Sequence, residues 1–386
     1  MAQTKVQAPF VEGGGGSSFK NLLINGDMQI WQRATAATAA TGACDTVDRW
    51  KILESSDGAI TSEQSALSTA DKATTGCRNA LLIKCTTTDS SIASGQYCYL
   101  SQGMEGQFLS HLGWGTTSAK TLTLSFWVKA YVAGTYSIFI KKYDNTAYYI
   151  PIEYTVDSSN TWEKKIIVIS PTSGSTSLIT GANGAFDQDN GLALLLGFNL
   201  AWGSSYHGTS GTWSSGTHFS TSNQTNFLSS TSNTFYLTGV QLEVGDLASD
   251  FEHLPFDVQL HRCMRYLEML VDPRSLGTGT LSTGDNNEGL GNFVNYTAQH
   301  AYGHFDFKVT KRSEAANFES ADGTNYFKYF NENTSDFVDV VLNVATEGHH
   351  AIQVYLDCGS GAISQGNGGF VRVNNAAATL LVEDEL

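Results

Sequence analysis

The chain has 386 residues, enough for roughly two or three domains of about 150 residues each. It contains 39 serine, 40 threonine and 38 glycine residues, whereas charged residues make up 15% of the chain, which disfavours a helical protein. A hydrophobic content of 41% excludes a disordered chain, and the formal net charge of −15 opposes a general role on nucleic acid or on an anionic membrane surface.

Residues 1–19 form a polar N-terminal segment that contains a run of glycine and serine at 13–18. Such a composition is typical of a flexible tether. The segment has no apolar stretch long enough for a signal peptide, and nowhere does the chain approach the ~18 consecutive apolar residues of a membrane helix. We therefore expect a soluble protein without membrane insertion. Residues 1–19 are expected to attach it to another molecule.

Residues 20–254 carry the pattern of half-buried β-strands. Between residues 121 and 129 every second side chain from Leu122 to Val128 is apolar, which predicts a strand with one buried face. Many short strands separated by turn residues are typical of a β-sandwich or jelly roll. Further extended segments are predicted at 21–24, 28–33, 136–140, 162–169, 192–198 and 234–244.

After Pro255 the apolar residues recur at steps of three and four, which predicts a connector helix over 255–272 that ends before Pro273. Its apolar stripe could bury itself around a threefold axis or against the protomer's own sandwich. The candidate oligomer contacts are Leu260, Met264, Leu267 and Val271. Extended patterns return over 273–386, so a second, smaller β domain is expected there. The predicted fold class is all-β: a jelly-roll sandwich, a short helix and a C-terminal β domain.

Catalytic signatures are absent from the sequence, which has no G-x-S-x-G, H-E-x-x-H or phosphate-binding loop, and we expect no enzyme, no metal and no cofactor. Two stretches offer candidate metal ligands. The run Asp187–Gly191 offers oxygen ligands for calcium but departs from the EF-hand pattern, which favours an ordinary turn. His349 and His350 are adjacent, so on a strand they point to opposite faces and favour surface positions.

Residues 202–227 combine aromatic rings with glycine, serine, threonine and asparagine. Exposed rings flanked by hydroxyls and amides are suited to sugars, because the apolar face of a pyranose stacks on the ring while its hydroxyls form hydrogen bonds. The same rings could instead plug the end of the sandwich or meet a neighbouring subunit. The sugar-site hypothesis requires at least one ring to be exposed. The candidate glycan contacts are Trp202, Tyr206, His207, Trp213, His218 and Phe219.

Two stretches resemble a known family, the tail-fibre and related receptor-binding proteins of tailed bacteriophages that carry a carbohydrate-binding-module-like jelly roll. The first is 21–33, followed by Asp48-Arg49-Trp50. The second is 235–245, which continues through 251–253 into Cys263-Met264-Arg265-Tyr266. The Asp-Glu-Leu ending is also similar to that of many such fibres. The resemblance covers about 20–270.

This resemblance implies a non-enzymatic, structural virion protein, a homotrimer made in the host bacterial cytoplasm and located on the phage tail or capsid surface. It would contact another virion protein through residues 1–19 and bind a host surface glycan, with residues 273–386 as a possible receptor-binding tip. Only about twenty residues precede the jelly roll here. A tail fibre, a tail-tip knob and a capsid appendage therefore remain open, as do a trimer and a hexamer.

Two other functions compete with attachment. One is a depolymerase that cleaves host surface polysaccharide, which would need two facing carboxylates that a sequence cannot place. The other is a carbohydrate-binding accessory module of a glycosidase, which predicts a monomer without virion association. Release of reducing ends from a host polysaccharide distinguishes the depolymerase from a protein that only binds.

Overall fold

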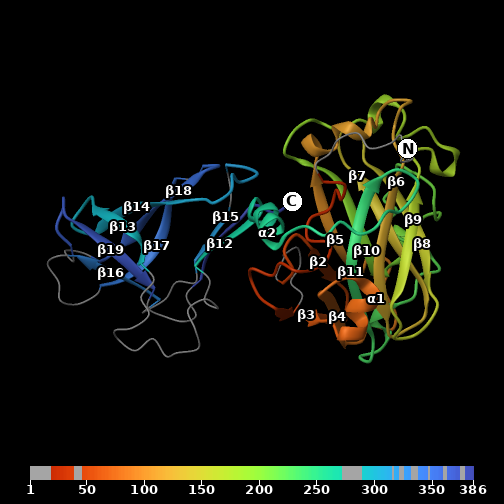
Figure 1. The fold of residues 1–386 in the computed structure, drawn as a ribbon, viewed down its shortest axis with the longest axis horizontal. Coiled ribbons are helices and arrows are strands. Elements are labelled where there is room, and N and C mark those ends of the chain that lie inside the picture. The colour runs from red at the N-terminus through yellow and green to blue at the C-terminus, as the bar shows by residue number, and fades with distance from the viewer. Residues whose placement is uncertain are drawn as a thin grey trace, which may run out of the picture. The chain divides into compact units, whose positions relative to one another are not determined.

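The structure is a computed structural model that describes residues 19–38, 46–271, 289–314, 317–320, 326–331, 338–346, 348–359, 363–373 and 379–386. The chain divides into two compact units, shown in Figure 1. The first unit contains the described residues of Met1–Asp27, Thr38–Thr41 and Ile52–His253. The second contains those of Met28–Ala37, Gly42–Lys51 and Leu254–Leu386. The expected tether at 1–19 lies outside the described residues except for Phe19.

The division differs from the expectation of one contiguous domain over 20–254. The described residues of Met28–Ala37 and Gly42–Lys51 cluster with the C-terminal unit, although they stand near the start of the chain. A sequence pattern reveals strands through local periodicity, but it carries no record of which distant segment a loop will contact.

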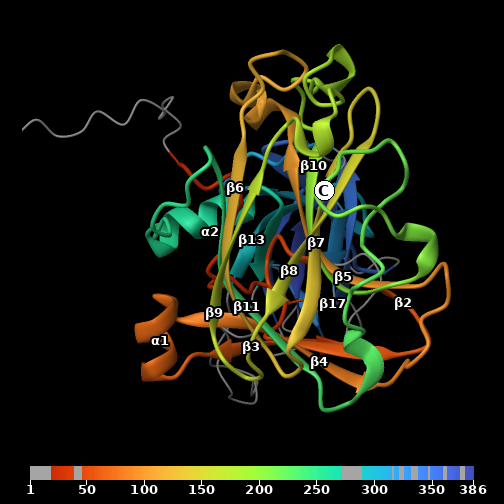
Figure 2. The same ribbon diagram turned by 90° about the vertical axis from the view of Figure 1, so that its right-hand side faces the viewer.

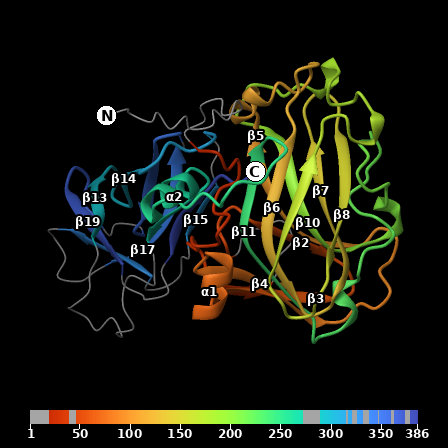
Figure 3. The ribbon, with the colours of Figure 1, turned by 45° about the vertical axis from the view of Figure 1, so that its right-hand side comes forward.

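Two antiparallel sheets form the sandwich, as the turned views in Figures 2 and 3 show. The six-stranded sheet has the order β1 (Ala36–Thr38), β3 (Ala59–Ala66), β4 (Asn79–Thr87), β11 (Thr234–Val244), β6 (Leu122–Ala130) and β9 (Glu163–Ile169). The five-stranded sheet has the order β2 (Lys51–Ser55), β5 (Tyr97–Glu105), β10 (Leu192–Trp202), β7 (Gly134–Lys142) and β8 (Tyr148–Val156). The connections contain helix α1 (Thr69–Thr75) and the 3-10 turns η1 (Gly106–Phe108), η2 (Ser110–Leu112), η3 (Ser173–Ser175), η4 (Ala182–Gly184), η5 (Ser204–Tyr206) and η6 (Phe227–Ser229).

The apolar core lies between these two sheets. Phe126 on β6 contacts Phe198 on β10 edge-to-face, with 5.0 Å between the ring centroids. Tyr136 on β7 and Phe235 on β11 approach to 5.8 Å. All four side chains are buried, so the alternate residues on these strands face away from the core. This arrangement confirms the predicted all-β sandwich.

The prediction of a strand at residues 21–24 is wrong, because the described backbone bends there instead of pairing as a strand. The buried side chain of Asn21 takes the place of ladder hydrogen bonds. Its amide donates to the carbonyl of Val240 at 3.0 Å, and its Oδ1 accepts from the backbone N–H groups of Leu23 and Leu242. A side chain that satisfies backbone groups in this way allows a short apolar run to be buried without strand geometry.

The C-terminal unit contains helix α2 (Phe256–Met264), a three-stranded sheet and a closed barrel. The three-stranded sheet has the order β12 (Leu267–Val271), β20 (Leu380–Glu383) and β15 (Asn317–Ser320). The barrel consists of β13 (Gly289–Asn295), β14 (His300–Asp306), β18 (Ala351–Asp357), β17 (Val338–Thr346), β16 (Phe327–Asn331) and β19 (Gly368–Val373). This unit confirms the predicted smaller C-terminal β region. Neither α-helix of the described residues is long and apolar enough to cross a membrane.

The predicted helix over 255–272 is only half correct. Helix α2 ends at Met264, and the following residues form strand β12, which pairs with β20. The run 267–271 is apolar and short, so its periodicity does not distinguish helix from strand, and pairing with β20 decides. Met264 is 6% exposed, while Leu267 and Val271, at most 1% exposed, lie on the strand. The predicted oligomer stripe is therefore corrected: of its members Leu260, Met264, Leu267 and Val271, three are buried within the protomer.

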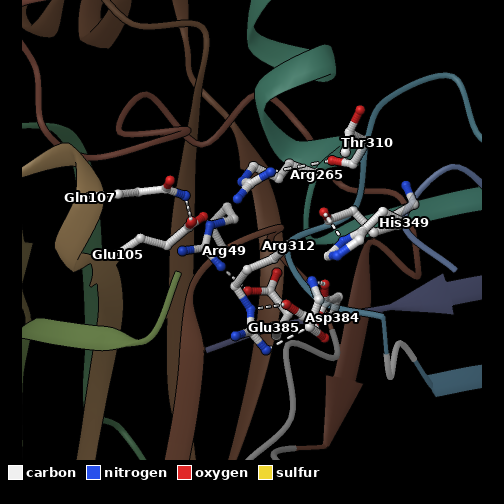
Figure 4. A network of polar contacts seen from close by, with 11 residues as sticks. Arg49, Glu105, Gln107, Arg265, Thr310, Arg312, His349, Asp384 and Glu385 are labelled. Carbon is white, nitrogen blue, oxygen red and sulfur yellow. Dashed lines mark hydrogen bonds and ion pairs between the residues drawn. The ribbon is translucent and has the colours of Figure 1, made fainter. Parts of the chain in front are cut away.

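Buried ion pairs hold the last residues of the chain in the C-terminal unit (Figure 4). Arg49 pairs with Glu385, and the two side chains are 1% and 2% exposed. The Arg49 guanidinium also lies 3.4 Å from the ring centroid of Tyr266. Arg312 pairs with Asp384 at 2.8 Å. Because a buried charge is costly without a partner, these contacts bind the C-terminal residues tightly to the unit.

A third buried pair joins β12 to the segment between β14 and β15. Lys311 Nζ lies 2.6 Å from Glu268 Oε2, and neither side chain is exposed. Burial lowers the pKa of Lys311, and the hydrogen bond to Glu268 opposes this shift. Glu268 is the acidic residue in the otherwise apolar strand β12, and its charge is satisfied by this charge-assisted contact with Lys311.

Candidate functional site

The outer face of the five-stranded sheet, the face turned away from the core, carries the candidate site. Residue Phe198 of β10 faces the core, so its neighbours Gly197 and Asn199 face outward. The strand register places Phe139 of β7 opposite Gly197 and Tyr99 of β5 opposite Asn199. Aromatic side chains of three adjacent strands therefore share this face.

Rings on this face form a continuous cluster around Trp202, which we call the outer aromatic cluster. The indole stacks on Phe219 at 4.7 Å with an interplanar angle of 8°, and on Tyr99 at 5.0 Å with an angle of 22°. The ring of Tyr206 lies 4.8 Å from the indole, and the ring of Tyr97 lies 5.3 Å from the indole. The outer aromatic cluster consists of Tyr97, Tyr99, Phe139, Tyr143, Leu195, Trp202, Tyr206 and Phe219.

Glycine at position 197 makes room for this cluster. A Cβ atom at that position would lie 2.1 Å from the ring of Phe139, closer than any side chain tolerates. Phe139 can therefore lie flat over the centre of β10, where Phe219 packs against it at 4.8 Å. The ring of Phe139 on β7 thus occupies the space that a side chain at Gly197 on β10 would otherwise fill.

A hydrogen-bond network fixes the loop that carries Phe219 to the sheet. Asn199 Nδ2 donates to the carbonyl of Phe219 at 2.7 Å and to Ser137 Oγ at 2.8 Å. Its Oδ1 accepts from Trp202 Nε1 at 2.6 Å. The loop also pairs with the edge of the sheet, where Tyr149 and Ser214 exchange backbone hydrogen bonds at 2.9 Å. The rings are thus held in place by buried polar contacts of the sheet itself.

Several rings of the cluster keep part of their surface accessible. Trp202 and Phe139 are buried, whereas the tyrosines and Phe219 are half-buried. Burial raises the pKa of Tyr99, and the nearby phenols of Tyr143, Tyr97 and Tyr206 raise it further. Burial also raises the pKa of Tyr143 to about 12. The phenols of Tyr99 and Tyr143 therefore stay neutral near pH 7 and offer both donors and acceptors to a ligand.

The structure brings four of the predicted glycan contacts together, buries the fifth, Trp213, and leaves the sixth, His218, outside the cluster. Trp202, Tyr206 and Phe219 belong to the cluster, and His207 Nε2 lies 3.1 Å from the carbonyl oxygen of Trp202. The expected exposed ring is found only in part, because Tyr206 and Phe219 are half-buried while Trp202, Trp213 and Phe227 are buried. The sugar-site hypothesis therefore keeps an accessible surface.

Trp213 and His218 do not form part of the outer aromatic cluster. Trp213 is 1% exposed, donates from Nε1 to the carbonyl of Ser170 at 2.9 Å and meets Trp114 edge-to-face. It is therefore a core side chain, and its assignment as a glycan contact is corrected. His218 hydrogen-bonds through Nδ1 to Ser214 Oγ at 2.9 Å, which fixes the loop.

Sequence reasoning missed the contribution of the strands to this face. Tyr97, Tyr99, Phe139 and Tyr143 stand more than fifty residues before the segment that carries Phe219. The alternation of Tyr97, Cys98 and Tyr99 places two aromatic rings on one face of a strand, and that pattern could have indicated the site. The pairing of β5 and β7 with β10 could not be derived from the residues alone.

Other groups with possible chemistry have structural roles among the described residues. Asp189 Oδ1 accepts from the backbone N–H of Gly191 at 2.9 Å, which makes the acidic run an Asx turn. No group of three or more histidine, cysteine or acidic residues suited to a metal ion occurs in the described ranges. Five described cysteines are buried free thiols, and burial raises the pKa of Cys77 to about 11, which disfavours a nucleophilic thiolate. Cys44 lies outside the described residues.

No protein-family model matches the chain, and no curated protein matches it. Distant likenesses to solved structures exist. One is the enzymatically active domain of tailspike protein 4 from bacteriophage CBA120, with 12% identity, a TM-score of 0.31, and coverage of 59% of this chain and 22% of that chain. A family 11 carbohydrate-binding module of a cellulosomal cellulase from Clostridium thermocellum shows 14% identity, a TM-score of 0.29, and coverage of 55% and 97%.

A third likeness is to a xylan-binding domain from Paenibacillus barcinonensis, with 12% identity, a TM-score of 0.25, and coverage of 55% of this chain and 94% of that one. The likeness to the tailspike spans less than a quarter of the tailspike chain. Likenesses with 12% or 14% identity and TM-scores of 0.31 or less assign no function to this chain. A functional proposal therefore rests on the chemistry of its own residues.

Proposed function

We propose that the outer aromatic cluster binds a glycan. The observation that carries this proposal is the gathering of half-buried aromatic rings and neutral phenols on a sheet face that points away from the core. Partly exposed rings offer apolar surface to the C–H face of a sugar, and three tyrosine hydroxyls, those of Tyr143, Tyr97 and Tyr206, lie close enough to influence the pKa of Tyr99. The buried network around Asn199 holds this surface in place before a ligand arrives, which reduces the entropy lost on binding.

The protein binds this glycan without cleaving it. Glycoside hydrolysis needs two carboxyl groups about 5–10 Å apart across the scissile bond. By register, two carboxylates lie on the outer face, those of Glu105 on β5 and Glu153 on β8. Glu105 is 0% exposed, and the register separates it from Glu153 by three strands and by roughly 20 Å along the strand direction. Glu153 accepts a hydrogen bond from Asn223 Nδ2 at 3.2 Å. A depolymerase would require a second accessible carboxylate within about 10 Å of Glu153.

Alanine in place of Tyr97 or Tyr206 is expected to weaken binding of host-surface polysaccharide about tenfold, or about 1.4 kcal/mol, because each substitution removes a half-buried ring from the binding surface. Isothermal titration calorimetry with purified polysaccharide measures the affinity. The same incubation with the unsubstituted protein is expected to release no reducing ends.

Tyr131→Ala is the matched control, because this tyrosine is 43% exposed and does not belong to the cluster. Its affinity should equal that of the unsubstituted protein. Equal affinity of all three variants would refute the site, and steady release of reducing ends would refute binding without cleavage.

In the finer assignment, the protein is a structural virion protein of a tailed bacteriophage that attaches the particle to the host cell. The two stretches quoted above that resemble phage receptor-binding proteins support this assignment. Residues 1–19 would then bind a neighbouring virion protein, while the sandwich presents its glycan site.

Removal of residues 1–19 is expected to leave both units folded and glycan affinity unchanged, but to abolish incorporation into particles. Complementation of a phage that lacks the gene, followed by immunoblotting of purified particles, measures incorporation. Circular dichroism of the truncated protein controls for folding. Particles that carry the truncated protein at the normal amount would contradict the docking role.

A further inference from the structure

A lysine lies within the aromatic rings of the outer face. Lys141 stands on β7 between Leu195 of β10 and Tyr149 of β8, so its side chain shares the face of the cluster. Its Nζ lies 3.7 Å from the ring centroid of Tyr143, 5.4 Å from that of Tyr149 and 6.0 Å from that of Phe219. The ammonium group is therefore surrounded on several sides by ring faces.

This ammonium lacks an anionic partner. Across the described part of the chain no hydrogen bond or ion pair joins Lys141 Nζ to another group. The neighbouring Lys142, by contrast, donates to the carbonyl of Asn183 at 2.7 Å, and the carboxylates of Asp144 and Asp187 favour its charged form. An unpaired lysine is unexpected in a chain in which 37 acidic residues accompany 22 basic ones.

The rings stabilise the charge of Lys141 only in part. Burial lowers its pKa, and no carboxylate contributes to the shift. Cation–π contacts favour an ammonium over a ring face, but they satisfy none of its three N–H donors as a carboxylate oxygen would. Glu153 is the acidic residue of β8 on the same face, four residues along the strand from Tyr149, which corresponds to about 13 Å. A cation in this position is left to pair with a ligand.

We propose that the outer aromatic cluster selects an anionic glycan, whose acidic substituent accepts hydrogen bonds from Lys141 Nζ while its sugar rings contact the tyrosines. This inference rests on the proposed glycan-binding function and adds a charge requirement to it. A charge-assisted hydrogen bond from a desolvated lysine is stronger than one between neutral groups. The overall charge of −15 would disfavour an anionic ligand at long range, so the local cation carries the selectivity.

The test uses a glycan array on which each acidic oligosaccharide, bearing a uronate, a sialate or a sulfate, has a neutral counterpart that lacks only the charge. The full-length protein is expected to prefer the acidic member of a pair, and Lys141→Gln should lower its affinity for that member roughly 10- to 100-fold while changing its affinity for the neutral member by less than about threefold. Lys141→Arg should retain most of the preference, since it keeps the charge.

Lys164→Gln controls for the change in net charge, because Lys164 is exposed on β9 of the opposite sheet. Equal binding of acidic and neutral members, with no effect of Lys141→Gln, would overturn the charge requirement but leave glycan binding intact. A protein that binds no member of the array would overturn both. Thermal unfolding of each variant confirms that it is folded at the assay temperature.

Discussion

Replacement of Arg49 by methionine is expected to lower the free energy of unfolding of the C-terminal unit by about 3–5 kcal/mol. The Arg49 and Glu385 side chains are almost completely buried, and they neutralise each other inside the unit. Without the guanidinium, the carboxylate of Glu385 would be buried beside a neutral side chain. Methionine also removes the cation from the ring of Tyr266. Urea denaturation followed by tryptophan fluorescence and circular dichroism measures the loss.

The double substitution Arg49→Met and Glu385→Leu tests whether the loss of stability comes from an unpaired buried charge. It removes both charges, so most of the stability lost in the single variant should return. Arg33→Met is the less buried control, because Arg33 and Glu383 are 14% and 16% exposed and their pair is partly solvated. The expected cost there is smaller than that of Arg49→Met. An equal cost for Arg33→Met and Arg49→Met would show that burial does not govern these pairs.

The residues that carry the family resemblance act mainly as architecture in the structure. Gln32 donates from its backbone N–H to Asp48 at 2.7 Å and from its side chain to the carbonyl of Leu267 at 2.6 Å. Arg49 pairs with Glu385, one of the last three residues. The stretch near the start of the chain, the residues after α2 and the Asp-Glu-Leu ending therefore form one buried polar network. These contacts lie within the C-terminal unit, whereas residues 21–27 and 235–253, which also carry the resemblance, belong to the sandwich unit.

Strands with one buried face were predictable because alternation is a local property. Leu122, Leu124, Phe126 and Val128 identify β6 without knowledge of any other segment. The run 267–271 shows the limit of that argument, since its five residues fit helix and strand equally and pairing with β20 decides between them. Arg49 shows a second limit. An arginine that directly follows an aspartate is typical of a surface, yet Arg49 is buried and pairs with Glu385 near the end of the chain.

The candidate site was predictable only in its loop. Tyr206 and Phe219 stand in a segment rich in aromatic and small polar residues, and this composition indicates a contact surface. Phe139 and Lys141 stand in a different strand, and their membership follows from the register of β7 against β10. Lys141 in particular has no sequence context that distinguishes it from Lys142, although alternation sends the two side chains to opposite faces of the sheet.

Alanine in place of Trp202 is expected to destabilise the sandwich unit by about 3–5 kcal/mol and to abolish measurable glycan binding. The indole is 7% exposed and lies between Phe219 and Tyr99, so its removal leaves a cavity and releases the rings that flank it. Because Trp202 is covered by other rings, we expect it to support the binding surface instead of contacting the sugar directly. Trp202→Phe should accordingly restore much of the affinity.

Trp114→Ala is the control that separates lost stability from lost binding. Trp114 is 4% exposed, stacks on Phe186 at 5.2 Å and donates to the carbonyl of Lys120, so it belongs to a different part of the unit. Both alanine variants should lose a similar free energy of unfolding, and affinity is compared at a temperature where both remain folded. The cluster is the binding site if only Trp202→Ala loses the glycan. Equal loss of affinity in both variants would mean that binding follows the stability of the sandwich, and the ring arrangement around Trp202 would then have no specific role.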